Sequence, residues 1–342
     1  MAVIDIGGYS VKALKKNKAY DFVLPVNCVG GTFTLPFADA KKLSHTLERV
    51  KKEARISECD LVLPDQWARQ LFVKIVNDEP QADVNKDYVI WRSKDQIREE
   101  VYAGAKIDAH ITSIETGDDK KQHISAYLCL VKYEILNKIT DIFAENGIII
   151  NSIELSSHAV YNYLSSAGML VEDFALLNIG YEVCTVYFFK NYQPVYVRII
   201  ETAGRHFENE LKPSAAKEIN SAETPEAFDA GIKQKEKNTM DLMSVKLFPD
   251  KADVSILEAF ESKKSPVMDN FLKEIHLTFE FFASKFPQIR ISKAFLSGGL
   301  CKNGGLDFFL SNFLSLEAVY ASDRDKIQYL PLYAMKERQL HG

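Results

Sequence analysis

The sequence VIDIGGYSVK at residues 3–12 combines an apolar strand, a glycine pair and a second strand. One carboxylate, Asp5, lies near the end of the first strand, and buried positions rarely carry an unpaired charge. The paired glycines, Gly7 and Gly8, let backbone N–H groups come close to a ligand, typically a phosphate. An ordinary hairpin, with the glycines in the turn and Asp5 as a cap, explains the same residues. The choice between these interpretations depends on partners elsewhere in the chain.

The second half of the chain contains a similar pattern. Residues 175–189, ALLNIGYEVCTVYFF, again predict a strand, a glycine loop and a strand. When the two patterns are aligned, Asn178 falls on Asp5 and Gly180 on Gly7, an offset of 173 residues. A repeat that is half a chain long and present twice predicts two duplicated lobes rather than a solenoid.

A third strand ends in glycines nearer the C-terminus. Residues 294–297, AFLS, predict a buried strand that runs into Gly298 and Gly299. In open α/β sheets, ligands bind outside the carboxyl ends of the strands. Loops from two duplicated lobes would therefore face each other across a ligand. A glycine pair before a helix would let the backbone approach a nucleobase, a sugar or a phosphate.

The composition is typical of a soluble globular protein, with 342 residues, 46% of them hydrophobic, and a formal net charge of −5. The length suggests two domains or one bilobed domain. The acidic balance argues against a nucleic-acid-binding protein, which would usually be basic. We expect no membrane span and no secretory signal. The five scattered cysteines, with no zinc-site spacing, predict reduced thiols in a cytoplasmic protein.

The region between the two repeats predicts an inserted subdomain, because its elements run strand, strand, helix, hairpin, helix. We expect its first helix at residues 94–105, with Ser93 as a possible N-cap. A polar stretch at 212–265 is expected to form short helices with a solvated face. The predicted organisation is a first lobe at 1–60 and 148–174, an inserted α+β subdomain at 61–147, and a second lobe at 175–342.

The three glycine loops resemble those of the actin, sugar-kinase and Hsp70 superfamily of nucleotide-binding proteins. DIGGYSVK at 5–12 looks like the first phosphate loop, NIG at 178–180 takes the place of the second, and LSGGL at 296–300 looks like the adenosine loop. An insertion in this position is similar to that of the FtsA and PilM branch. The segments SKDQIREEVY, FALLNIGYEVCTVYFFKNYQPVYVRII and LPLYAMKERQL are most similar to the PilM family of type IV pilus assembly. The resemblance implies a bilobed actin-like α/β fold.

The resemblance also implies ATP and Mg²⁺ as ligands. The residues at matching positions are Asp5, Gly7, Gly8, Tyr9, Ser10, Lys12, Asn178, Gly180, Tyr181, Gly204, Gly298, Gly299 and Leu300. Those of the first loop would meet the β- and γ-phosphates, with a point charge from Lys12. Asp5 would hold magnesium through water. The second loop would lie on the opposite side of the phosphates, and the last three residues near the adenosine. Gly204 would approach the ligand with its backbone.

The sequence departs from the superfamily at Asn178, where the family pattern has an aspartate. An amide has nearly the same shape but no charge, so it cannot act as a general base and is a poorer magnesium ligand. Glu154, Ser156 and His158, at the end of another strand, are the nearest groups to orient a water, but for His158 a packing or helix-start role is the favoured interpretation. We expect nucleotide binding with slow or absent hydrolysis, and we assign no catalytic residue.

The resemblance to PilM implies a cytoplasmic scaffold that docks the N-terminal cytoplasmic peptide of an inner-membrane partner such as PilN. Such a protein would reach the membrane only through its partners. Self-association is compatible with this interpretation. An FtsA-like division protein would polymerise and carry an amphipathic membrane helix. An actin-like component of a type II secretion system would continue into a membrane span. A sugar or acetate kinase would need a catalytic carboxylate where Asn178 stands. The chain stops soon after its last expected strand, which favours the pilus scaffold.

Overall fold

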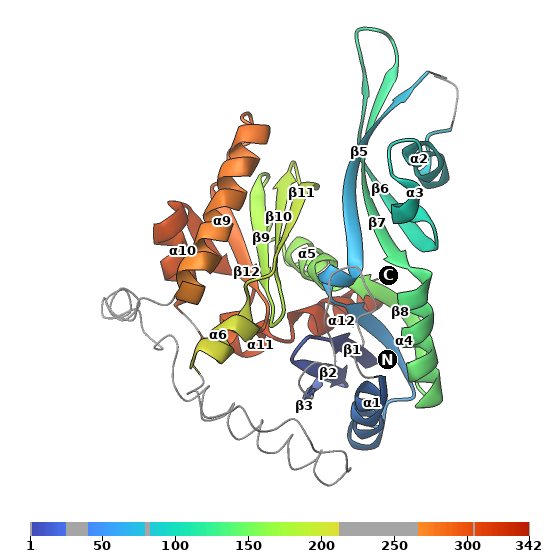
Figure 1. The fold of residues 1–342 in the computed structure, drawn as a ribbon, viewed down its shortest axis with the longest axis vertical. Helices are drawn as coiled ribbons and strands as arrows, with labels where there is room; N and C mark the ends of the chain where they lie inside the picture. The colour runs from blue at the N-terminus through green and yellow to red at the C-terminus, as the bar shows by residue number, and fades with distance from the viewer. Residues whose placement is uncertain (1, 25–39, 79–82, 212–265, 304, 342) are drawn as a thin grey trace.

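Two five-stranded sheets of the same design form the body of the computed structural model, which describes residues 2–24, 40–78, 83–211, 266–303 and 305–341 (Figure 1). The first sheet has the order β3-β2-β1-β4-β8, with bounds Lys18–Val23, Ser10–Lys15, Ala2–Ile6, Glu58–Leu63 and Ile149–Leu155. The second has the order β11-β10-β9-β12-β13, with bounds Gln193–Ile200, Cys184–Lys190, Phe174–Ile179, Lys293–Ser297 and Glu317–Tyr320. In each sheet the central strand pairs antiparallel with its hairpin partner and parallel with the strand on its other side. The predicted duplicated lobes are confirmed.

Alternating residues of the central strands face different layers, because successive side chains point to opposite faces of a sheet. In β1, Ile4 packs into the core made with α1 (Ala40–Ala54) and α4 (Tyr133–Glu145), whereas Val3 packs on the other face, against α12 (Leu330–His341). In β9, Leu177 faces α9 (Pro266–Lys285) and Leu176 faces α5 (Ser156–Ser166). Helices α5 and α12 therefore lie between the two lobes (Figure 1). By the same alternation, Asp5 and Asn178 point toward the space between the lobes.

The second lobe is completed by several short elements on its outer side and at its strand ends. They are α6 (Gly204–Leu211), the 3₁₀ turn η2 (Gly299–Asn303), α10 (Leu306–Leu314) and α11 (Arg324–Ile327). Side chains of α6, α9, α10 and α11 belong to the core on the face of β9 that carries Leu177. The loop after β12 enters the 3₁₀ turn η2 directly and then α10, the helix that was expected after the glycine pair.

The inserted subdomain is a three-stranded antiparallel sheet of order β5-β7-β6, which projects away from the two lobes (Figure 1). Its elements are β5 (Ala68–Asn77), α2 (Lys86–Ser93), α3 (Glu99–Tyr102), β6 (Ala105–Thr116) and β7 (Gln122–Lys132). The expected boundaries at 61 and 147 fall inside β4 and just after α4. Helix α4 packs with α1 on the first sheet, so its apolar face belongs to the core of the first lobe.

The expected helix at 94–105 is wrong. The helix of this region is α2, at Lys86–Ser93, and only a single helical turn, α3, follows. Asn85 caps α2 by accepting a hydrogen bond from the Tyr88 N–H at 3.0 Å. The Ser93 hydroxyl donates back to the Ile90 carbonyl at 2.9 Å instead of starting a new helix. A serine can form either bond, and here its place at the end of α2 decides which one is made.

The C-terminal helix α12 returns to the first lobe, although residues 175–342 were expected to form the second. Leu332 and Met335 pack with Val3 and Leu14 on the inner face of the first sheet. The apolar pattern of α12 predicts a buried helix but not the lobe that buries it. Contact with α5 along the same face makes α12 part of the junction between the lobes.

The described cysteines Cys59, Cys129, Cys184 and Cys301 are free thiols, three of them buried, in line with the expectation of reduced core residues. Cys28 and the polar stretch 212–265, with its expected short helices, lie outside the described residues. None of the helices in the described part of the chain is long and apolar enough to cross a membrane.

Candidate functional site

The glycine loops of the two lobes have the same backbone geometry. The Gly7 N–H donates to the Ser10 carbonyl at 2.9 Å, and the Gly180 N–H donates to the Val183 carbonyl at 2.9 Å. Both loops follow the carboxyl end of the central strand of their sheet, which is where open α/β sheets bind ligands. The repeat in the sequence is therefore also a repeat of local structure, and its two copies face each other.

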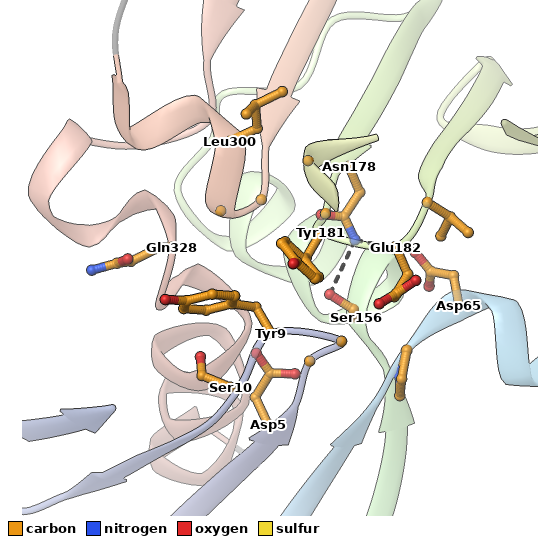
Figure 2. Close-up of a pocket in the computed structure, with 18 of the residues that line it drawn as sticks. Asp5, Tyr9, Ser10, Asp65, Ser156, Asn178, Tyr181, Glu182, Leu300 and Gln328 are labelled. Carbon is orange, nitrogen blue, oxygen red and sulfur yellow. Dashed lines mark hydrogen bonds between the residues drawn. The ribbon is translucent and has the colours of Figure 1, made fainter. Parts of the chain in front are cut away.

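One cavity between the lobes is lined by every residue that the sequence predicted for nucleotide binding (Figure 2). They are Asp5, Gly7, Gly8, Tyr9, Ser10, Lys12, Asn178, Gly180, Tyr181, Gly204, Gly298, Gly299 and Leu300. Figure 2 shows the first loop below the cavity, with Leu300 above it and Asn178 and Tyr181 beside it. Tertiary structure thus brings together the three glycine loops, which are far apart in the chain, and Gly204 at the start of α6.

Asp5 and Ser10 supply buried polar groups at the floor of the cavity. Asp5 is 6% exposed, and the Lys12 Nζ lies 3.6 Å from its Oδ2. Burial raises the pKa of the Asp5 carboxyl above its usual range, and the charge of Lys12 acts in the opposite direction. The Ser10 hydroxyl is buried and has no hydrogen-bond partner among the described residues. A buried, unpaired hydroxyl beside a glycine loop suits a ligand that brings its own acceptor oxygens.

Two of the glycines allow backbones to approach where a side chain would not fit. Gly298 has a φ of +97°, and a Cβ there would lie 2.4 Å from the carbonyl oxygen of Ile179. A Cβ at Gly8 would lie 2.2 Å from the Cγ of Glu182. The first glycine lets the loop after β12 touch the end of β9, and the second lets the loops of the two lobes touch each other.

The loops of the two lobes meet directly beside the cavity. The rings of Tyr9 and Tyr181 lie 5.0 Å apart at an interplanar angle of 58°. The Glu182 carboxylate, whose side chain is 12% exposed, is held by Arg205 at 2.9 Å. The charged side chains that line the cavity are Asp5, Asp21, Asp65, Glu182 and Lys12. This lining is acidic, so a polyphosphate would suit it only together with a divalent cation.

Both the Nδ2 and the Oδ1 atom of the Asn178 amide form hydrogen bonds. Its Nδ2 donates to Asp65 Oδ2 at 3.1 Å and to Ser156 Oγ at 3.1 Å, the second of which is the dashed line in Figure 2. Its Oδ1 accepts a hydrogen bond from Ser297 Oγ at 3.3 Å. The residue predicted to replace a family aspartate is therefore at the cavity wall, and it joins the second lobe to the first.

Asp65, Glu182 and Gln328 line the cavity but were not predicted. A signal for Asp65 exists in the sequence, because it directly follows the apolar run LVLP at 61–64, much as Asp5 lies near the end of the apolar run VIDI at 3–6. Glu182 lies within the second glycine loop, where it is read most easily as a solvated side chain. Gln328, in the turn after α11, has no sequence signal that would connect it with the loops.

The structure separates the three groups that were expected to orient a water. Ser156 lines the cavity between the lobes, whereas Glu154 and His158 line a second groove. Glu154 accepts a hydrogen bond from Asn162 at 2.6 Å, and His158 Nε2 lies 2.7 Å from the Tyr127 hydroxyl. For Glu154 the expectation is wrong, whereas the packing role weighed for His158 is confirmed. Strand β8 ends at Leu155 and α5 begins at Ser156, so the two-residue periodicity of a strand, which would keep these three side chains on one face, ends between them.

The second groove lies between the inserted subdomain and the two lobes. Its lining combines apolar and charged side chains, among them Ile107, Leu136, Ile153, Lys106, Asp108 and Glu154. Its base contains His158 and Tyr127, which burial keeps neutral, because it lowers the pKa of the histidine and raises that of the tyrosine. Two outer strands, β8 of the first sheet and β6 of the inserted sheet, contribute to its walls.

No protein-family model matches the chain, and no curated protein matches it in sequence. Among solved structures, the chain is similar to the PilM–PilN type IV pilus biogenesis complex, with a TM-score of 0.69 and 15% identity over 98% of this chain and 97% of that one. It is also similar to MreB5 of Spiroplasma citri bound to AMPPNP, with a TM-score of 0.51 and 14% identity over 99% of this chain and 96% of that one. The chain has the bilobed actin-like fold, and the resemblance to PilM is confirmed for the fold.

Proposed function

We propose that the chain is an actin-like scaffold of type IV pilus assembly. It binds ATP between its lobes and docks a short cytoplasmic peptide of an inner-membrane partner. The observation that carries the nucleotide part is the convergence of both glycine loops and the loop after β12 on one cavity. Similarity to the fold of the PilM–PilN complex supports the partner. The protein would work in the cytoplasm, at the inner membrane through its partner.

The residues of the cavity fit a magnesium nucleotide. The Ser10 hydroxyl, buried and unpaired among the described residues, would donate to a phosphate oxygen. The equivalent backbone turns at Gly7 and Gly180 would approach the phosphates from opposite sides. Asp5 would hold the ion through water. Mg²⁺ would supply the positive charge that this acidic lining lacks. Gly299 and Leu300 would lie along the adenosine.

Hydrolysis is expected to be slow or absent. Asn178 cannot take a proton from water, since its amide is not basic. The nearby carboxylate of Asp65 is already occupied, because it accepts hydrogen bonds from Ser157 and from Asn178. The Glu182 carboxylate of the second glycine loop, which also lines the cavity, is paired with Arg205. Binding without turnover suits a scaffold rather than a kinase.

The second groove is the proposed docking place for the peptide. An extended peptide gains main-chain hydrogen bonds when it lies along an unpaired strand, and β8 and β6 are the outer strands of their sheets. Ile153 of β8, 40% exposed, lines the groove and offers an apolar contact for an alternate side chain of the peptide. Charged side chains along the groove, among them Lys106, Asp108 and Glu154, would set the direction of the bound peptide.

Titration with a fluorescent ATP analogue, with and without Mg²⁺, followed by a phosphate-release assay, tests the nucleotide part. We expect saturable, magnesium-dependent binding and little phosphate release. Rapid turnover in the presence of a sugar would instead identify a kinase. An absence of binding would leave only a docking module. Ser10→Ala should weaken binding, and Ser152→Ala, at an exposed serine of the first sheet that does not line the cavity, is the control for a change outside the site.

Pull-down with peptides from pilus and from division membrane proteins tests the partner. Ile153→Arg should abolish capture of the pilus peptide. Ile149→Arg is the matched control, because Ile149 lies on the same strand and is 67% exposed but does not line the groove. Capture of the division peptides alone would favour an FtsA-like role. Equal loss in both variants would mean that the peptide binds elsewhere on β8.

A further inference from the structure

Asp65 is a buried carboxylate that forms hydrogen bonds with two other parts of the fold. It follows β4 of the first lobe, in the 3₁₀ turn η1 (Asp65–Trp67), and is 2% exposed. Its Oδ1 accepts from the Ser157 N–H at 3.0 Å, and its Oδ2 accepts from the Ser157 hydroxyl at 2.5 Å. These bonds cap the first turn of α5, the helix between the lobes. Its Oδ2 also accepts from Asn178 of the second lobe at 3.1 Å.

We infer that Asp65 and Asn178 form a latch that closes the lobes, in which Asp65 is the positioning residue and Asn178 is an amide because it must donate to Asp65. Asp65 is then the second buried carboxylate of the cavity, in addition to Asp5. It belongs to the first lobe, whereas the family pattern places this carboxylate at position 178 of the second glycine loop. The consequence for nucleotide binding rests on the proposed function. The latch itself rests only on the contacts of the folded chain.

The chemistry of the pair requires one acid and one amide. An aspartate at position 178 would bring two carboxylates to about 3 Å, where one of them would have to stay protonated. The other charged groups that line the cavity are Asp5, Lys12, Asp21 and Glu182, and Lys12 is already paired with Asp5. Nothing in the lining therefore offsets a second charge at this point. The amide carbonyl is fixed by Ser297, so the Nδ2 group is directed to Asp65.

The latch needs neither a metal ion nor a nucleotide. A hydrogen bond between an amide and a buried carboxylate is favourable in itself, and the N-terminus of α5 adds a positive end to the site. The pair therefore contributes to contact between the lobes through groups of the chain itself. Nucleotide would bind to a preformed cleft, which fits a scaffold better than a filament that opens and closes with each nucleotide.

A double-mutant cycle in the full chain tests the pair. Asp65→Asn and Asn178→Asp should each lower the melting temperature by about 2–4 °C at neutral pH. The double variant, which exchanges the two groups, should recover most of this loss. Asn178→Asp alone should also recover as the pH falls, because protonation of one carboxyl ends the repulsion. A merely space-filling role would produce neither the rescue nor this pH profile.

Asp60→Asn is the matched control, because Asp60 is also buried in β4 and accepts a hydrogen bond from a serine, Ser152, at 2.6 Å. It should lower the melting temperature without any rescue by Asn178→Asp. Losses that simply add in the Asp65 and Asn178 double variant would overturn the latch. The cycle is measured without ligand, so a failure to bind the ATP analogue would defeat the proposed function and leave this result standing.

Discussion

Tyr9 in the loop of the first lobe and Tyr181 in the loop of the second place their rings 5.0 Å apart beside the cavity. The pair comes from equivalent regions of the repeated pattern and closes one side of the cleft. Aromatic pairs of this kind contribute about 1 kcal/mol beyond their buried area. A ligand that enters between the loops must therefore part the two rings or pass beside them.

Removal of one ring should make the cavity easier to enter. Tyr181→Ala should raise the association rate of a fluorescent ATP analogue about fivefold, which corresponds to the loss of about 1 kcal/mol of ring contact. Stopped-flow fluorescence measures this rate. Tyr181→Phe keeps the ring and should behave like the unaltered protein. An equal effect of both substitutions would assign the role to the hydroxyl rather than to the ring pair.

Asp5→Asn should stabilise the protein at neutral pH. Because burial raises the pKa of Asp5 in the folded chain, the ionised form costs stability at pH values above that pKa. The unaltered protein should gain stability as the pH falls through this range, and the difference from Asp5→Asn should vanish below about pH 4. Thermal unfolding across pH checks this. Lys12→Met should enlarge the pH dependence, and a neutral-pH loss in Asp5→Asn would show that the Lys12 pair outweighs burial.

The same substitution should weaken the magnesium-dependent part of nucleotide binding. If Asp5 holds the ion, Asp5→Asn should raise the dissociation constant of the magnesium nucleotide about tenfold. The constant without Mg²⁺ should change much less. An identical change in both conditions would mean that Asp5 acts on the phosphate loop and not on the metal.

Gly298 and Gly299 offer a test of the loop after β12. Gly298→Ala should cost about 2–3 kcal/mol in the free energy of unfolding, because of its positive φ and the Ile179 carbonyl at 2.4 Å from the added Cβ. Gly299→Ala meets nothing within 4 Å and should be nearly neutral. Chemical denaturation measures both. Similar costs at the two positions would show that the loop relaxes around either methyl group.

Exchange of the latch residues should also alter nucleotide chemistry. The variant that combines Asp65→Asn with Asn178→Asp carries its carboxylate on the second glycine loop, as in the superfamily pattern. We expect stronger magnesium dependence and measurable phosphate release from this variant but not from Asp65→Asn alone. A phosphate-release assay at several Mg²⁺ concentrations tests this expectation. A release rate and a magnesium dependence equal to those of the unaltered protein would indicate that position 178 does not face the phosphates.

The sequence by itself determined the two lobes and the location of the cavity. The two copies of the strand, glycine loop and strand share an equivalent backbone hydrogen bond, because a short turn is set by local backbone chemistry. The predicted nucleotide residues meet for the same reason, since each loop follows the carboxyl end of a buried strand. The sequence prediction failed where a residue is locally ambiguous. The Ser93 hydroxyl, for example, can cap a following helix or donate to the helix before it, and it does the second.

Tertiary structure alone decided the partners across the lobes. Nothing near Asn178 in the chain indicates that Asp65, 113 residues away, would accept its hydrogen bond. Likewise, α12 is apolar in its sequence, but only packing against Val3 and Leu14 assigns it to the first lobe. Glu154 and His158 line the second groove and not the cavity for a similar reason. The direction of each side chain depends on how its strand or helix packs against its neighbours. Such contacts follow from the docking of finished elements, and the energy that selects them is spread over the whole interface between the lobes.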